Sequence, residues 1–325
     1  MLPRPRTFLI ELAAFALLLG TLPPVSGGYF IHVYTIGLYY VMLAASWNLL
    51  AGFTGQFSLA THAFASIGGY GSALLALHTG LPLWASVPAG AILAAATGWL
   101  LGMVTLRMRK IYLALATWAF AESYRLFLTT EYRWTRGDMG LSTAQFFPGA
   151  DPTPYFYLLL GGAALTIALL YAILASRAGF LLRAIRDDEE AAQAMGTPVV
   201  RWKLFAFTVS SFLAGAAGAL YGHYVGLLTP ASVKFNEMAL ILIMVCTGGM
   251  RSFWGPVFGA LFIHVLSEAL RINASAFGRV SPLLRDLVEN RMVLFAVLVI
   301  LLMRFHREGI AGLLRTASAR VRRRA

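Results

Sequence analysis

Charged residues are scarce in this sequence. Asp, Glu, Lys and Arg make up only 12% of its 325 residues, against about 25% in soluble domains. None occurs between Leu12 and Leu106, and a soluble core cannot use so long an uncharged stretch. Since a membrane-spanning helix needs about 20 apolar residues, this stretch alone can cross a bilayer several times. The composition therefore excludes a soluble globular protein. It predicts an all-α, polytopic integral membrane protein with a single transmembrane domain over residues 1–325.

Other absences exclude whole classes of chemistry. The one cysteine, Cys246, lies in an apolar run, so it can form no internal disulfide and indicates no metal site. His264 and Glu268 are four residues apart, but no third ligand accompanies them. The sequence also lacks the phosphate-binding pattern G-x-x-x-x-G-K followed by Ser or Thr, so this chain is not an ATPase. We expect no catalytic residues, no metal and no cofactor on it.

Apolar runs bounded by charges, Pro or Gly predict about ten transmembrane segments. Their ranges are 7–22, 29–51, 61–78, 83–106, 111–129, 155–176, 204–228, 237–248, 256–270 and 291–304. Some of them are too short for a complete crossing. The first 27 residues resemble a signal peptide, but Glu11 interrupts their apolar part, and we expect an uncleaved first helix.

Basic residues are distributed unevenly over the two faces that these segments define. With the N-terminus inside, 18 of the 26 basic residues fall on one face, and the positive-inside rule makes that face cytoplasmic. Both termini and the loop 177–203 are then cytoplasmic. The net charge of +12 therefore indicates topology and not nucleic acid binding. We expect the basic cytoplasmic tail 305–325 to meet anionic lipid headgroups.

Two Gly-rich polar breaks interrupt the apolar runs, one in each half of the chain. Residues 52–63 read GFTGQFSLATHA, and residues 248–260 read GGMRSFWGPVFGA. Paired breaks of this kind indicate a binding site in transporters, although two ordinary tight turns between helices would give the same pattern. The structural glycines expected in these breaks are Gly52, Gly55, Gly248, Gly249 and Gly255.

Polar residues within or beside the apolar segments are the candidates for a translocation path. Unwound backbone is tolerated at membrane depth only where it lines a cavity or is buried in protein. The candidates are Asn48, Thr54, Gln56, Ser58, His62, Glu122 and Thr247. Each could instead make a hydrogen bond between helices. Glu122 lies three residues before Arg125, a spacing that predicts an ion pair on one helix.

The densest mixture of both charge signs lies in residues 183–203, which read RAIRDDEEAAQAMGTPVVRWK. A charge at the centre of a bilayer costs about 2.5–3.5 kcal/mol or more, so this stretch must lie in water at a membrane surface. Its acids suit the start of a short helix. Gly196 can end that helix with a positive φ, and Pro198 prevents its continuation. A generic amphipathic surface helix would share these features.

Several motifs together resemble one family. The stretch 179–192, GFLLRAIRDDEEAA, continues to KLFAF at 203–207, and it contains the start of the pattern EAAxxxG. Other motifs are NLLAGFTGQFSL at 48–59, IYLALATWAFAE at 111–122, and the stretches 214–221 and 248–256. In this order, over about residues 30–312, they resemble the branched-chain amino acid ABC transporter permeases of the LivM type.

The resemblance implies the permease subunit of an ATP-driven importer, which moves branched-chain or related amino acids across the bacterial inner membrane by alternating access. It also implies partners: a second homologous permease, two ATP-binding subunits that carry ATP and Mg²⁺, and a periplasmic solute-binding protein. In this family the EAAxxxG segment docks on the ATPase subunit. The matching or flanking residues are Arg183, Arg186, Asp187, Glu190, Ala191, Ala192 and Gly196.

Other functions share part of this pattern. Permeases similar to this family carry urea, short amides or organic acids, so the resemblance leaves the solute open. A stand-alone secondary transporter or channel would need ion-coupling carboxylates in the membrane. The uncharged run from Leu12 to Leu106 argues against that function, while Glu122 keeps it open. An integral membrane enzyme would need an acid/base cluster at the interface, and His, Asp and Glu cluster only in the acidic stretch.

Overall fold

Helices make up almost all of the computed structural model, which describes residues 3–25, 27–108, 110–149, 151–280, 291–305, 309 and 312. The longer helices are α1 (Pro5–Gly20), α2 (Gly28–Asn48), α3 (Thr61–Thr79), α4 (Leu83–Thr105), α5 (Lys110–Thr130), α7 (Thr153–Ala175), α8 (Arg177–Asp187), α10 (Val199–Val225), α11 (Phe235–Gly248), α12 (Gly255–Val280) and α14 (Arg291–Phe305). The shorter ones are α6 (Tyr132–Thr135), α9 (Glu189–Ala194), the π-helical η2 (Leu49–Thr54), and the 3-10 turns η1 (Pro23–Val25), η3 (Gly137–Met139) and η4 (Pro230–Val233). The prediction of an all-α protein is confirmed.

Every apolar segment predicted from the sequence coincides with a helix. Among the described residues, five helices are long and apolar enough to span a membrane: Gly28–Thr54, Leu83–Thr105, Thr153–Ala175, Val199–Val225 and Gly255–Asn273. The chain is therefore a polytopic membrane protein. The largest difference is α12, which runs to Val280 and not to residue 270. The segment was predicted to end before the charged Arg271. Nη2 of Arg271 pairs with Oε1 of Glu268, one turn earlier on the same helix, at 2.8 Å, and such a pair is compatible with a helix that continues.

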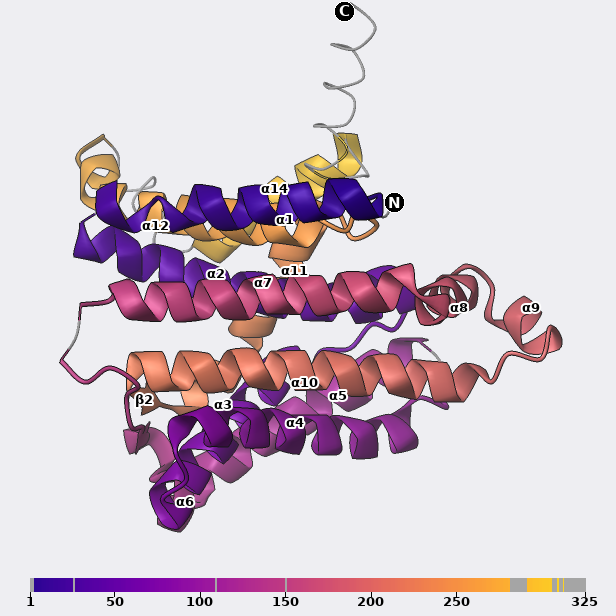
Figure 1. The fold of residues 1–325 in the computed structure, drawn as a ribbon, viewed down its shortest axis with the longest axis horizontal. Coiled ribbons are helices and arrows are strands. Elements are labelled where there is room, and N and C mark those ends of the chain that lie inside the picture. Colours follow the sequence, from indigo (N-terminus) through magenta and orange to yellow (C-terminus); the bar gives the residue numbers. More distant parts are fainter. Residues whose placement is uncertain are drawn as a thin grey trace, which may run out of the picture.

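The long helices form two layers, with their axes running in roughly the same direction (Figure 1). The first layer contains α1, α2, α7, α12 and α14, and the second contains α3, α4, α5 and α10. The helix α11 crosses from the second layer, where Phe235 packs against Trp118 of α5, to the first. The N-terminus lies at the same end of the molecule as α8 and α9. At the opposite end, β1 (Leu141–Ser142) pairs antiparallel with β2 (Leu227–Leu228). The connection from α7 through α8 and α9 to α10 therefore joins the two layers at one end.

Glycines set the close packing of α3, α4 and α10. A Cβ on Gly68 would lie 2.1 Å from the carbonyl oxygen of Gly215, and one on Gly218 would lie 1.9 Å from that of Ala65. Small residues at such interfaces let helix backbones approach closely, which is how membrane helices gain packing energy. The second layer is consequently a tightly packed unit around α10.

Aromatic contacts fasten α1 to the first layer. The ring of Phe8 stacks on that of Tyr171 in α7 with centroids 3.7 Å apart. The indole nitrogen of Trp254 donates to Oε2 of Glu11 at 2.6 Å. Glu11, the acid that interrupts the first apolar run, thereby bonds to the segment between α11 and α12.

Candidate coupling and translocation site

The helix α9 is short, capped at its start and projects from one end of the molecule (Figure 1). Asp188 is its N-cap and accepts the backbone N–H of Ala191 at 3.0 Å. Glu189 and Glu190 lie in its first turn, where the positive end of the helix dipole stabilises carboxylates. After the helix, Gly196 has a φ of 81°. This left-handed conformation is the one that the sequence predicted for Gly196.

The residues predicted to couple to an ATPase divide into an exposed group and an anchoring group. Glu190, Ala191 and Gly196 are exposed, and Met195 beside them is 86% exposed. Ala192 is buried in a small cluster with Ile185 and Val199. The exposed group could therefore contact another protein, while Ala192 holds α9 to the ends of α8 and α10.

The two predicted arginines turn back toward the body of the protein. Arg183 donates from Nη1 to the carbonyl oxygen of Leu174 at 3.2 Å, which holds the corner between α7 and α8. Arg186 donates from Nη1 to the carbonyl oxygen of Gly52 at 3.0 Å. Its Nη2 also pairs with Oδ1 of Asp187 at 2.7 Å. Gly52 belongs to the first Gly-rich break, so α8 and that break are in direct contact.

The first Gly-rich break turns the end of α2 into a π-helical segment. Residues Leu49–Thr54 form η2, and Gly55 follows with a φ of 70°. The N–H of Gln56 donates to the carbonyl oxygen of Leu50 at 3.0 Å, which closes the turn. The chain then runs without helix until α3 begins at Thr61. The predicted break is confirmed, and single π-turns of this kind are frequent at functional sites.

The second Gly-rich break is a tight turn between α11 and α12. A Cβ on Gly248 would lie 1.9 Å from the carbonyl oxygen of Gly255, and Gly249 has a φ of 106°. Glycine is therefore required at these positions both by space and by conformation. For this break the tight-turn interpretation is the one that the structure supports.

The two Gly-rich breaks lie against each other, although about 200 residues separate them in the sequence. Asn48 donates from Nδ2 to the carbonyl oxygen of Ser252 at 3.3 Å. A Cβ on Gly52 would lie 2.2 Å from the carbonyl oxygen of Met250. Three segments that are distant in the sequence, namely α8, the first break and the second break, thus form one contiguous group.

Several predicted path residues hold a buried polar atom that has no hydrogen-bond partner among the described residues. A buried unsatisfied polar atom costs about 1–3 kcal/mol, so water or a solute is the expected partner. These atoms are Asn48 Oδ1, Gln56 Oε1, His62 Nδ1 and Thr247 Oγ1. Thr54 and Ser58 differ, since Thr54 Oγ1 donates to the carbonyl oxygen of Leu50 at 2.5 Å and Ser58 Oγ accepts from the N–H of Ala60 at 3.3 Å.

Glu122, the remaining path candidate, lies on α5 and forms the ion pair that its spacing predicts. The Nε of Arg125 donates to Oε1 of Glu122 at 3.0 Å, and the side chain of Glu122 is 38% exposed. The pair belongs to α5 and not to the two Gly-rich breaks. The carboxylate of Glu122 nevertheless interacts electrostatically with His62, another path candidate, and Oγ1 of Thr117 on the same helix accepts from the N–H of Leu59 in the first break at 2.9 Å.

The sequence analysis missed the position of Lys203. The carbonyl oxygen of Lys203 accepts from Nε2 of Gln56 at 3.3 Å, and its ammonium group pairs with Oε2 of Glu189 at 2.6 Å. One residue at the start of α10 therefore contacts both α9 and the first Gly-rich break. The signal in the sequence was a lysine before an apolar run, which indicated topology and the family resemblance but no contact partner.

A second missed group is a carboxylate among tyrosines. The hydroxyl of Tyr40 donates to Oε2 of Glu237 at 2.9 Å, and the rings of Tyr39 and Tyr221 stack with centroids 4.2 Å apart. Glu237 lies in the first turn of α11. An acid at the first position of the apolar run 237–248 was the signal that could have found it.

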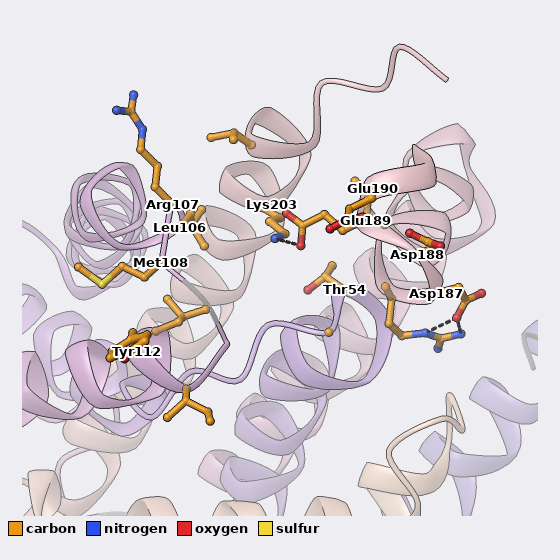
Figure 2. A pocket seen from close by; sticks show the side chains of 16 residues that line it. Thr54, Leu106, Arg107, Met108, Tyr112, Asp187, Asp188, Glu189, Glu190 and Lys203 are labelled. Carbon is orange, nitrogen blue, oxygen red and sulfur yellow. Dashed lines mark hydrogen bonds and ion pairs between the residues drawn. The ribbon is translucent and has the colours of Figure 1, made fainter. Parts of the chain in front are cut away.

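A cavity of about 860 Å³ opens between residues 183–203, hereafter the coupling stretch, and the first Gly-rich break (Figure 2). The labelled side chains come from η2, from the turn between α4 and α5, from α5, from the ends of α8 and α9 that adjoin each other, and from the start of α10. The lining residues are Thr54, Gly55, Leu106, Arg107, Met108, Ile111, Tyr112, Leu113, Ile185, Arg186, Asp187, Asp188, Glu189, Glu190, Val200 and Lys203. Acidic, basic and apolar side chains thus line one cavity beside the first break.

Metal-ligating residues do not gather in the part of the chain that the structure describes. No group of three His, Cys, Asp or Glu could hold a metal ion there. His264 donates from Nε2 to the carbonyl oxygen of Val33 at 2.9 Å, and Glu268 forms an ion pair with Arg271. The pair that suggested a metal site from its spacing thus makes other contacts.

The family model described as the branched-chain amino acid transport system permease component matches residues 29–303. The chain belongs to this permease family. The LivM permease protein of the high-affinity branched-chain amino acid transport system from Salmonella typhimurium is 30% identical, over 88% of this chain and 70% of that protein. LivM from Escherichia coli is 29% identical over the same shares. LivH from Escherichia coli is 25% identical, over 82% of this chain and 90% of that protein.

One solved structure, PsaBC from Streptococcus pneumoniae in complex with Fab, aligns with a TM-score of 0.47 and 14% identity, over 86% of this chain and 91% of that chain. Family membership makes the chain a transport component and not an enzyme. As one component of a transport system, the permease works in a complex with other subunits.

Proposed function

We propose that this permease is the membrane-spanning subunit of an ATP-driven importer, which moves branched-chain or related amino acids across the bacterial inner membrane. The observation that carries the proposal is the position of α9. Glu190 and Ala191 of α9 and Gly196 just after it are exposed and can contact another protein. The neighbouring residues Arg186 and Lys203 contact the first Gly-rich break. A partner that moved α9 would therefore act on the candidate path.

The proposed topology has about ten transmembrane segments, with both termini and the loop 177–203 in the cytoplasm. Two observations support it. Every predicted segment coincides with a helix, and Arg107, Arg186 and Lys203 line one cavity beside α9. A cluster of basic residues at one end agrees with the positive-inside rule. The proposed lipid-binding tail 305–325 lies almost entirely outside the described residues.

The proposed partners are a second homologous permease, two ATP-binding subunits and a periplasmic solute-binding protein. ATP and Mg²⁺ would be bound by the ATP-binding subunits, because this sequence contains no phosphate-binding loop. The acids of α9 suit docking against a basic groove of such a subunit. The names of the LivM and LivH relatives support the amino acid class of the solute.

The proposed mechanism is alternating access between the two helix layers. The binding protein delivers the solute to the outer face, and closure of the ATP-binding subunits moves α9. The path would use Asn48, Gln56, His62 and Thr247, because their unsatisfied buried atoms can accept or donate to a solute or to water. No covalent chemistry is needed from this chain.

Replacement of two exposed coupling residues tests the docking role of α9. In proteoliposomes that contain the complete importer, Glu190→Ala combined with Gly196→Ala should abolish ATP-driven uptake of the solute while leaving the ATP-binding subunits able to hydrolyse ATP. The reason is that the first change removes an exposed carboxylate, and the second disfavours the positive φ that ends α9. Uptake and ATP hydrolysis are measured in parallel, and full transport by the double variant would contradict the proposal.

The solute class has its own test. Isothermal titration of the solute-binding protein with leucine, isoleucine and valine should give saturable binding, and uptake by the importer should follow the same order of preference. If the binding protein instead binds urea, a short amide or an organic acid tightly and does not bind these amino acids, the proposed permease function still stands. The proposed amino acid class of the solute is then wrong.

A further inference from the structure

Arg186 lies between the coupling stretch and the first Gly-rich break. It is in the last turn of α8, immediately before α9. Its Nη1 donates to the carbonyl oxygen of Gly52 at 3.0 Å, while Nε and Nη2 bind Oδ1 of Asp187 at 3.0 and 2.7 Å. Its side chain is only 21% exposed. One guanidinium group therefore joins the base of α9 to the end of α2.

The carbonyl group that Arg186 holds belongs to the irregular part of the helix. In a regular α-helix the carbonyl oxygen of Gly52 would accept from the N–H of Gln56, four residues later. That N–H instead donates to the carbonyl oxygen of Leu50 at 3.0 Å. Arg186 thus supplies the donor that the π-helical turn has taken away. The contact depends on the shape of η2, so the position of α8 and the conformation of the break are linked.

Close packing on both sides of this contact restricts how far α8 and the first break can move relative to each other. A Cβ on Gly55 would lie 3.2 Å from Cγ of Arg186, so glycine lets the arginine stem lie directly on the break. On the other side, Gly52 touches the carbonyl group of Met250 in the second break. A shift of α8 that keeps the bond to Gly52 must therefore move the first break against the second.

We propose that Arg186 is a positioning residue that transmits movement of α8 and α9 to the two Gly-rich breaks through the carbonyl group of Gly52. This inference rests on the proposed docking of α9 to an ATP-binding subunit, and it adds the route by which that movement reaches the transport path. A role limited to the ion pair with Asp187 would need no contact with Gly52.

The first test measures solute taken up per ATP hydrolysed by the complete importer in proteoliposomes. Arg186→Gln should lower this ratio about tenfold, the loss that corresponds to one hydrogen bond from a charged group, while ATP hydrolysis stimulated by the binding protein continues. Arg186→Lys keeps the charge and one donor and should restore part of the ratio. Arg177→Gln, at the exposed start of the same helix, is the matched control and should stay within about twofold of the parent.

A reversible crosslink supplies a second test that does not depend on the glutamine variant. A Cβ on Gly55 would lie 3.8 Å from Cβ of Arg186, within the ~3.5–4.5 Å range of disulfides. In a Cys246→Ser background, Gly55→Cys with Arg186→Cys should give a low ratio when reduced and a higher ratio when oxidised, because the disulfide rejoins α8 to the break, while the strain of a side chain at a φ of 70° is the same in both states. Gly55→Cys alone should not respond to the oxidant.

The outcomes separate this inference from the proposed function. A parental ratio in Arg186→Gln, or an equal ratio for the reduced and oxidised cysteine pair, would overturn the role of Arg186. Absence of binding-protein-stimulated ATP hydrolysis in the parent importer itself would instead overturn the proposed function. A lowered ratio that recovers with the disulfide is the result that we expect.

Discussion

At the residue scale, glycine does two different things in this permease. Gly218 and Gly68 allow helices to touch, because a Cβ on either would lie about 2 Å from a backbone oxygen of the next helix. Gly196 and Gly55 are instead needed for their positive φ. The first kind of glycine determines how tightly the second layer packs, and the second kind determines where a helix stops.

The packing glycines give a prediction with a matched control. Gly218→Ala places a Cβ 1.9 Å from the carbonyl oxygen of Ala65, and such overpacking should destabilise the protein by about 1–3 kcal/mol. Gly161→Ala, in α7, meets nothing within 4 Å and should leave stability unchanged or raise it by about 0.5–1 kcal/mol. Thermal unfolding of the purified permease in one detergent compares the two. Equal melting temperatures would contradict the packing role of Gly218.

At the element scale, α9 has only six residues and depends on its ends. An isolated helix of this length is not stable in water, so the Asp188 cap, the ion pair of Glu189 with Lys203 and the buried Ala192 must hold it. The rest of α9 projects away from the body (Figure 1). A helix built in this way can present a fixed shape to a partner while burying little surface of its own.

Removal of the cap should loosen α9 without changing the transmembrane helices. Asp188→Ala removes the acceptor for the N–H of Ala191 and should cost about 1 kcal/mol of local helix stability. Asp188→Asn keeps a capping oxygen and is the control. Hydrogen exchange over residues 189–195 should speed up several-fold in the alanine variant alone. If both variants exchange at the parental rate, the cap does not hold α9.

Local signals in the sequence predicted the elements because each acts within about one turn. Apolar runs predicted every long helix except α8, which contains four charged residues, and Gly196 and Pro198 predicted the end of α9. The helix α12 was predicted too short because a charge was taken as its end, while Arg271 is neutralised by Glu268 on the same helix. Element type was therefore predictable, and helix ends were predictable only where backbone conformation decides them.

Contacts between distant segments could not be predicted in the same way. Nothing in the spacing of Gly52, Arg186 and Met250 indicates that they meet, because their contact depends on how the layers pack. The same holds for Lys203, which bonds to Glu189 and to Gln56. These three residues lie in separate elements that only the folded structure brings together. The polar residues of the candidate site were visible in the sequence, but their partners were not.

At the scale of the whole molecule, the two helix layers are joined at the α9 end by the coupling stretch and the first Gly-rich break (Figure 1). The arrangement suits alternating access, because a force on α9 acts where both layers and both breaks are in contact. The proposed function places the contact of an ATP-binding subunit with the permease at α9.

Site-specific crosslinking tests that claim most directly. Met195 beside α9 and Met139 at the opposite end are 86% and 74% exposed, so they form a matched pair. In a Cys246→Ser background, Met195→Cys carrying a short bifunctional reagent should crosslink to the ATP-binding subunit, with a yield that changes when ATP is added. Met139→Cys should give no such product. Crosslinking of the ATP-binding subunit to position 139, or none to position 195 in the assembled importer, would contradict the account.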